Sequence, residues 1–247
     1  WTYTMDNAHD EFIKDQQYTD SVKVKAADGT EQLITVKITG ADEIVEEPCD
    51  SVAPTVKSVA IVSATGIKNN YLNKDDEVSI KVSMSEDVVV SGTPKLQIKI
   101  YNKNVDATFV SASGADLYFK YKILDKQTDS NGISIDENKL SISGGSIKDA
   151  AGNDAILNHS AVDDNENYMV DTSSPSGIKK IEFGDSKFKA ELENSLSTGE
   201  KAYYSFDNIS WNEANINDKA FEIVKGSNTK IYMKVEDLAG NFSSVKS

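Results

Sequence analysis

The sequence predicts an all-β protein made of tandem β-sandwich modules, and three observations support this class. Apolar and polar residues alternate with a period of two in most patterned stretches, which is typical of half-buried strands rather than helices. Runs of roughly five to eight such residues are separated by turns rich in Gly, Asn, Asp and Ser, as in antiparallel sandwiches. The chain has 247 residues, which suits several small modules better than a single sandwich.

The first alternating stretch surrounds an Asp28-Gly29 turn. Its apolar residues are Val22, Val24 and Ala26 before the turn, and Ile34, Val36 and Ile38 after it. Two alternating runs joined by Asp-Gly predict an antiparallel hairpin with one buried face. Four later runs predict further buried strand faces: Val78, Ile80, Val82 and Met84; Leu96, Ile98 and Ile100; Leu117, Phe119, Tyr121 and Ile123; and Ile231, Met233 and Val235.

Two acidic stretches that contain prolines interrupt these patterns, at residues 42–54 and 163–175. Proline stiffens a linker and favours an extended approach to the next strand. We therefore expect a partial β module at residues 1–45, an acidic linker at 46–53 and two complete sandwiches at 54–174 and 175–247. In series, these modules would form an extended rod.

A short motif occurs twice, each time just before the last stretch of a predicted sandwich. Asp149-Ala150-Ala151-Gly152-Asn153 recurs as Asp237-Leu238-Ala239-Gly240-Asn241. Glycine supplies a position with positive φ, and Asp and Asn side chains satisfy the amides of a turn. The motif predicts a structural turn, with a role in metal binding as the alternative.

The charge of the chain excludes some classes of partner. The formal net charge is −14, with 40 acidic residues against 26 basic ones, and every basic residue is lysine. Nucleic-acid binding needs a basic face that arginine usually serves, so it is not expected, and neither is binding to an anionic membrane. An acidic surface attracts divalent cations instead. Cys49 is the one cysteine, and no apolar run is long enough to span a membrane.

No catalytic set is found in the sequence, so we predict that the chain is not an enzyme. The two histidines, His9 and His159, fall in different modules, and each is interpreted as a solvated loop residue. Zinc-ligand spacing and the Gly-x-Ser-x-Gly nucleophile motif are absent. Cys49 lies among acidic residues, which disfavour a reactive thiolate.

The first module resembles the second half of a VCBS repeat, a cadherin-like sandwich of large bacterial adhesins. The matching stretches are Trp1–Asn7, Ala27–Thr30 and Ile34–Gly40. The first strands of such a repeat are absent, so we expect the chain to start within a module or to receive those strands from elsewhere. An incomplete sandwich leaves strand edges open, which allows self-assembly through another copy.

Residues 54–174 resemble the bacterial immunoglobulin-like repeats of giant RTX-type adhesins, and residues 176–247 are similar, more loosely, to another such module. The matching stretches are Ala53–Val56, Ser63–Gly66, Leu72–Val78, Met84–Glu86, Ser91–Leu96, Asn131–Ile135, Gly144–Asn153, Val170–Thr172, Tyr203–Trp211 and Asp237–Asn241. The resemblance implies immunoglobulin/cadherin-like sandwiches that act as a non-catalytic extender or adhesin segment. It also implies an extracellular location, at a bacterial cell surface or secreted.

Calcium is the cofactor that the acidic junctions favour, because it takes six to eight oxygen ligands. The candidate ligands are Asp42, Glu43, Glu46, Glu47, Asp50, Glu86, Asp149, Asn153, Asp163, Asp164, Asp171 and Asp237. Strand layout predicts that Glu86 and Asp149 approach each other at one end of the first sandwich. The alternative is that these acidic residues simply stay solvated.

Aromatic residues of the last module offer a second candidate site. Trp211 and Tyr203, with Tyr204 beside them, are candidates for a sugar platform, and packing of Trp211 in the core is the alternative. The corresponding functions are a glycan- or protein-binding third domain and an accessory region of a secreted hydrolase. Expected partners are neighbouring modules and a host or matrix glycan or protein, without nucleic acid or membrane insertion.

Overall fold

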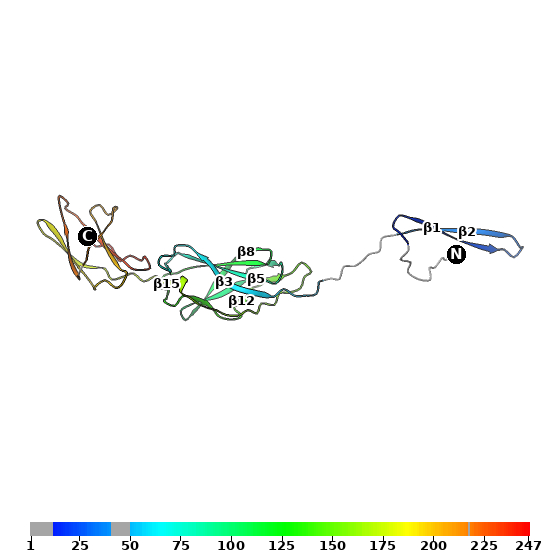
Figure 1. The fold of residues 1–247 in the computed structure, drawn as a ribbon, viewed down its shortest axis with the longest axis horizontal. Helices are drawn as coiled ribbons and strands as arrows, with labels where there is room; N and C mark the ends of the chain where they lie inside the picture. The colour runs from blue at the N-terminus through cyan, green and yellow to red at the C-terminus, as the bar shows by residue number, and fades with distance from the viewer. Residues whose placement is uncertain (1–11, 41–49, 217) are drawn as a thin grey trace. The chain divides into compact units, whose positions relative to one another are not determined.

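The computed structural model describes residues 12–40, 50–216 and 218–247 (Figure 1). Within them, the regular elements are β-strands and one short 3-10 helix, η1 (Glu166–Tyr168), so the predicted all-β class is confirmed. Among the described residues, no helix has the length and apolar character needed to span a membrane. The chain divides into two compact units, Trp1–Asp50 and Ser51–Ser247.

The first unit contains the predicted hairpin. Strands β1 (Gln17–Lys25) and β2 (Glu31–Thr39) pair antiparallel, with Val22 opposite Ile34. The predicted buried face is wrong: no residue of either strand is buried, and half of the Val22 side chain (50%) is exposed. Alternation predicts which side chains share a face, but a face becomes buried only against a second layer, which two paired strands alone do not supply.

The second unit begins with a large sandwich. Its main sheet runs in the order β14-β11-β7-β8-β9-β5-β3, with β12 also paired to β7. The bounds are β3 (Val56–Ala64), β5 (Glu77–Met84), β7 (Lys95–Ile100), β8 (Lys103–Ser113), β9 (Asp116–Lys122), β11 (Ile133–Ile135), β12 (Leu140–Ser141) and β14 (Val162–Asn165). Two smaller sheets complete it: β10 (Thr128–Asp129), β15 (Met169–Asp171) and β4 (Tyr71–Leu72); and β13 (Ser146–Lys148) with β6 (Val89–Ser91).

The core of this first sandwich lies along the strands that the alternation predicted. The inward sets of β5, β7 and β9 are buried, and Ile123 continues the last of them. Leu72, Ile147 and Val170 from the small sheets join the same cluster, so all three sheets enclose one core. Figure 1 shows the first sandwich around β3, β5, β8 and β12.

A second, smaller sandwich follows, with a core of its own. One sheet contains β16 (Ile178–Phe183), β17 (Lys187–Leu192) and β20 (Ala220–Val224), and the other contains β19 (Asn212–Glu213), β18 (Lys201–Ser205) and β21 (Tyr232–Glu236). Phe188 is fully buried between them, together with the predicted inward residues Ile231, Met233 and Val235. Because the two clusters share no residue, each sandwich has its own hydrophobic stabilisation.

His159 is a buried structural residue, and its interpretation as a solvated loop residue is wrong. Only 8% of it is exposed. Its Nε2 accepts hydrogen bonds from the backbone N–H groups of Lys139 (2.8 Å) and Leu140 (3.2 Å). Its Nδ1 then donates to the Ser160 carbonyl at 2.8 Å. The neutral ring thus satisfies three backbone groups, and no nitrogen is left for a metal ion or a substrate. His9 lies outside the described residues.

Candidate functional site

Both copies of the Asp-x-Ala-Gly-Asn motif fold into the same closed turn. The Asp149 carboxylate accepts hydrogen bonds from Asn153 N (2.9 Å) and Nδ2 (2.8 Å). The Asp237 carboxylate likewise accepts from Asn241 N (2.8 Å) and Nδ2 (3.0 Å). Gly152 has a φ of 97° and its counterpart in the second copy has 92°, a conformation that glycine adopts without strain. The predicted structural turn is therefore confirmed at both positions.

The second copy, Asp237–Asn241, also joins the two sandwiches of the second unit, and we call it the junction turn. Its backbone carbonyls accept hydrogen bonds from side chains of the first sandwich. Asn69 Nδ2 donates to the carbonyl of Leu238 at 2.8 Å, and Asn73 Nδ2 donates to that of Ala239 at 2.8 Å. Two carbonyls of the turn are therefore satisfied across the junction rather than by water.

Two more interactions cross the same junction. Asn241 Nδ2 donates to the backbone carbonyl of Asp171 at 2.8 Å. Lys68 Nζ forms an ion pair with Glu236 Oε1 at 2.5 Å, and the Glu236 side chain is only 12% exposed. The aliphatic part of the Lys68 side chain packs against Gly240, where an added Cβ would lie 2.9 Å from Lys68 Cδ. Glycine at this position thus allows both the turn geometry and the close approach.

The donors of the first sandwich lie on the segment Lys68–Asn73, which we call the clamp loop. Its first four residues form a tight turn in which Lys68 and Tyr71 exchange backbone hydrogen bonds of 2.9 Å. Asn69 and Asn70 have φ values of 50° and 67°, which asparagine tolerates better than most residues. The turn leads directly into β4, which pairs in parallel with β15. This pairing places the clamp loop beside the strand that ends at Asp171.

The pKa of the aspartate is shifted in opposite directions in the two copies of the motif. Hydrogen bonds from Asn153 hold the pKa of Asp149 below its usual value. Burial raises the pKa of Asp237 instead, and repulsion from Asp171 adds to the shift. In the described part of the chain, the Asn73 Oδ1 atom is buried without a hydrogen-bond partner. The second copy is therefore a packed junction in which a negative charge is costly.

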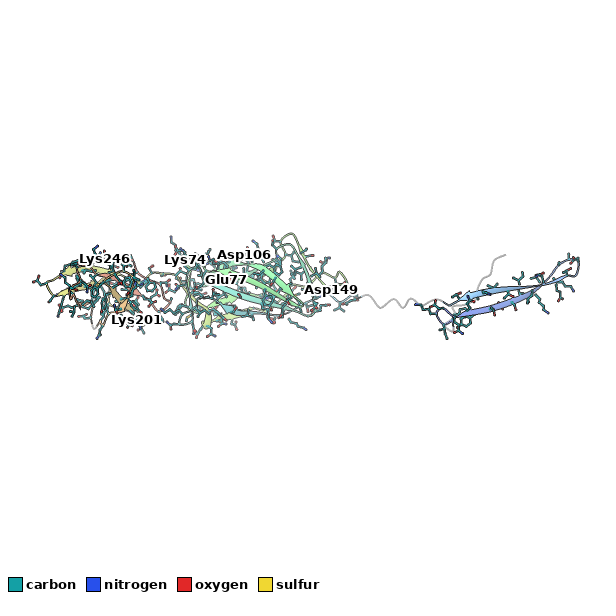
Figure 2. All side chains as sticks on the ribbon, turned by 90° about the horizontal axis from the view of Figure 1, so that it is seen from above. Lys74, Glu77, Asp106, Asp149, Lys201 and Lys246 are labelled. Atoms are coloured by element: carbon teal, nitrogen blue, oxygen red, sulfur yellow. The ribbon has the colours of Figure 1, made fainter. Side chains whose placement is uncertain are left out.

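Two of the predicted calcium ligands, Glu86 and Asp149, come together beside the first copy. Glu86 follows β5 and Asp149 follows β13. A carboxylate oxygen of Glu86 lies within 4.8 Å of one of Asp149. Asp50, which belongs to the first unit, is exposed. Figure 2 shows Asp149 and Lys74, which follows the clamp loop, at opposite ends of the first sandwich.

The other predicted ligands do not join this group. Asp171 and Asp237 lie at the junction turn. Asp163 is exposed, and Asp164 accepts a hydrogen bond from Asn131 Nδ2. Asp42, Glu43, Glu46 and Glu47 lie outside the described residues, as does Cys49.

The aromatic candidates lie on the second sandwich around a lysine. Lys234 Nζ is 4.3 Å from the ring centroid of Trp211 and 3.7 Å from that of Phe242. Trp211 is half-buried and does not belong to the core cluster, so its predicted core packing is wrong, whereas Tyr204 does pack against that core. Tyr203 lies opposite Lys234 in the sheet, and burial raises the pKa of its hydroxyl.

The sequence did not reveal Lys68, Asn69 and Asn73 as functional residues. Consecutive asparagines are a signal for a tight turn, but nothing in them says which distant carbonyls they will meet. From the sequence, the junction turn is predictable as a turn but not as the surface that these side chains contact.

The similarity of the chain to known proteins is confined to solved structures. No protein-family model matches it, and no curated protein matches it significantly. Among solved structures, it is similar to the crystal structure of chicken CNTN1 FN1-FN3 domains, with a TM-score of 0.34 and 8% sequence identity. That match covers 95% of this chain and 77% of the other. The assignment of β-sandwich modules therefore rests on the strands and cores described above.

Proposed function

We propose that this chain is a non-catalytic spacer segment of a large bacterial surface or secreted protein, whose sandwiches hold a more distal part away from the cell. The observation that carries the proposal is the set of hydrogen bonds between the clamp loop and the junction turn. A spacer must resist bending, and bending concentrates where modules meet. The extracellular location follows from the resemblance to surface repeats and is part of the proposal.

The energy of the junction is sufficient to hold one orientation. The three neutral hydrogen bonds are those donated by Asn69, Asn73 and Asn241. At about 1 kcal/mol each, they favour the docked arrangement by about 3 kcal/mol, or more than about a hundredfold. The Lys68–Glu236 ion pair adds less, because the lysine is 45% exposed and solvent screens the attraction.

Removing both clamp asparagines should free the second sandwich to move. In a chain with Cys49 replaced by serine and spin labels at Ser111 and Ser186, we expect a narrow distance distribution by pulsed electron paramagnetic resonance. The double variant Asn69→Ala/Asn73→Ala should broaden it, because two of the three neutral bonds are lost. The matched control is Asn104→Ala/Asn158→Ala, two exposed asparagines outside the junction. A distribution as broad in the parent as in the variant would refute the rigid spacer.

We also propose that calcium binds at the acidic group of Glu86 and Asp149. Calcium–oxygen distances of about 2.3–2.6 Å allow two ligands of one ion to lie up to about 5 Å apart. The carboxylates of Glu86 and Asp149, within 4.8 Å of each other, meet this limit. Without a cation, two negative charges this close repel each other. Binding would thus stabilise this end of the first sandwich.

Calcium should raise the melting temperature of the first sandwich, and Glu86→Gln should remove most of that increase. Glu86 is the residue to change, because Asp149 also closes its turn. Differential scanning calorimetry in millimolar calcium and in EDTA measures the effect, with Glu166→Gln, an exposed glutamate, as the control. Equal melting temperatures of the parent in both conditions would eliminate the calcium site while leaving the spacer proposal intact.

A glycan site at Trp211 is the alternative function. The structure disfavours its simplest form, because Lys234 Nζ occupies one face of the ring on which a sugar would stack. Tyr203, the other aromatic candidate, is half-buried, and burial raises the pKa of its hydroxyl, so it offers no fully exposed second platform. The spacer is therefore the function that we propose first.

A further inference from the structure

A hollow of about 360 Å³ lies on the first sandwich, apart from the acidic group and from Trp211. Its lining combines two tyrosines, three residues with aliphatic hydroxyls, two aspartates and a valine: Tyr71, Tyr101, Thr128, Asp129, Ser130, Val170, Asp171 and Ser173. A second hollow of about 230 Å³ is also lined by Tyr101 and Thr128. Tyr101 therefore stands between two depressions, and we call the larger one the Tyr101 hollow.

The base of the Tyr101 hollow is the small sheet β10-β15-β4. Its inner side chains, Leu72, Asp129 and Val170, are at most 2% exposed. Register places Thr128 opposite Asp171, and successive side chains of a strand alternate between the faces. Thr128 and Asp171 therefore share the outer face, where they border the hollow. A rigid sheet thus presents a hydroxyl and a carboxylate side by side.

Tyr101 itself is held in a costly conformation. It lies between β7 and β8 with a φ of 55°, and 64% of it is exposed. Glycine or asparagine usually occupies such a hairpin position, because a bulky side chain is disfavoured at positive φ. An exposed ring gains little packing in return. Strain without a packing gain is the pattern found where a side chain serves a ligand.

A buried carboxylate keeps the Tyr101 backbone in place. Asp129 is 2% exposed and accepts hydrogen bonds from the backbone N–H groups of Tyr101, Asn131 and Gly132. With three donors bound, Asp129 is a support for the turn rather than a ligand group. The exposed ring is thus presented from a fixed backbone, which lowers the entropy cost of binding.

Polar groups around the ring remain available for a ligand. Within the described part of the chain, the hydroxyls of Tyr71, Tyr101, Thr128, Ser130 and Ser173 form no hydrogen bond with another residue. Among the described residues, Ser173 N alone donates a hydrogen bond to the carboxylate of Asp171, to its Oδ1, so its second oxygen can accept from a ligand. An aromatic face flanked by hydroxyl and carboxylate acceptors matches a sugar, which has an apolar C–H face and a rim of hydroxyls.

We propose that the Tyr101 hollow binds a neutral oligosaccharide, with one pyranose ring stacked on Tyr101 and its hydroxyls bound by Asp171 and Thr128. An anionic glycan is disfavoured by Asp171 and by the net charge of −14. The open, polar lining suits an extended chain of sugars better than a compact apolar molecule. This activity goes beyond the spacer role and does not depend on it.

The test is a ¹⁵N–¹H nuclear magnetic resonance titration of the whole chain with cellohexaose, chitohexaose and mannohexaose in turn. We expect shifts of the amides of Tyr71, Tyr101, Thr128 and Ser173 with at least one of these probes. Tyr101→Ala should weaken that binding by about tenfold or more, because the stacking surface is lost. Tyr118→Ala, a matched tyrosine outside the hollow, should bind like the parent.

A second variant separates binding from folding. Tyr101→Gly should lose binding while its melting temperature equals or exceeds that of the parent, because glycine accepts positive φ without strain. Absence of shifts with all three probes, or unchanged binding by Tyr101→Ala, overturns the proposal. Shifts that centre on Trp211 and disappear in Trp211→Ala also overturn it, and they support the alternative site instead.

Discussion

Replacing Asp129 by alanine should lower the free energy of unfolding of the first sandwich by at least about 3 kcal/mol. The carboxylate is 2% exposed and accepts three backbone hydrogen bonds, from Tyr101, Asn131 and Gly132. Alanine would leave all three donors without their acceptor, and a hydrogen bond to a charged group contributes about 1.5–3 kcal/mol. A surface acidic residue has no comparable effect.

Urea unfolding followed by nuclear magnetic resonance of first-sandwich amides measures this loss. Asp129→Asn should fall between the parent and the alanine variant, because its single carbonyl oxygen replaces part of the acceptor capacity. Asp163→Ala, at an exposed position, should unfold within about 0.5 kcal/mol of the parent. If Asp129→Ala unfolds like this control, Asp129 does not hold the turn, and the support for Tyr101 fails with it.

The strands of the first sandwich could be predicted because their side chains alternate between a core and an outer face. The inward residues of β5, such as Val78 and Ile80, are fully buried as expected. The same alternation misled at Val22, since a period of two reports a shared face and not the layer that covers it. The burial of His159 is not predictable from local sequence for a related reason: it depends on the backbone of residues 139–140, distant in sequence.

The candidate site was predictable in its parts but not in its assembly. The turns at Asp149 and Asp237 followed from residue chemistry alone, since each carboxylate binds an asparagine four positions later. Strand layout also placed Glu86 near Asp149, as the structure does. The clamp asparagines and Tyr101 could not be found in this way. Their roles come from long-range contacts and from backbone strain, which local patterns do not record.

Replacing Phe188 by alanine should unfold the second sandwich under conditions in which the first remains folded. Phe188 is fully buried, and its ring lies 5.3 Å from that of Phe183 and 6.2 Å from that of Phe206. Removing a buried phenylalanine costs about 3–5 kcal/mol. A domain of roughly 70 residues has only about 4–10 kcal/mol of stability, so most of its margin would be lost.

The expected result depends on how strongly the junction couples the two cores. Since they share no residue and meet through a few side-chain hydrogen bonds, the junction contributes about 3 kcal/mol, less than a complete core. In a urea titration of Phe188→Ala, amides of residues 178–235 should therefore lose their dispersion first, while those of β5, β7 and β9 persist. Changes in the first sandwich should be confined to the clamp loop and Asp171, whose partners have been released.

Phe183→Ala is the matched control, because that ring contacts Phe188 but is 57% exposed, and its removal should leave the second sandwich folded. If both sandwiches of Phe188→Ala unfold together, they form one cooperative unit, and the stiffness between them arises from a shared fold rather than from the hydrogen bonds of the clamp loop. If the second sandwich unfolds first, the two are independent folding units. Each sandwich would then fold on its own core, and the asparagines of the clamp loop would determine only their relative orientation, as a spacer of repeated modules requires.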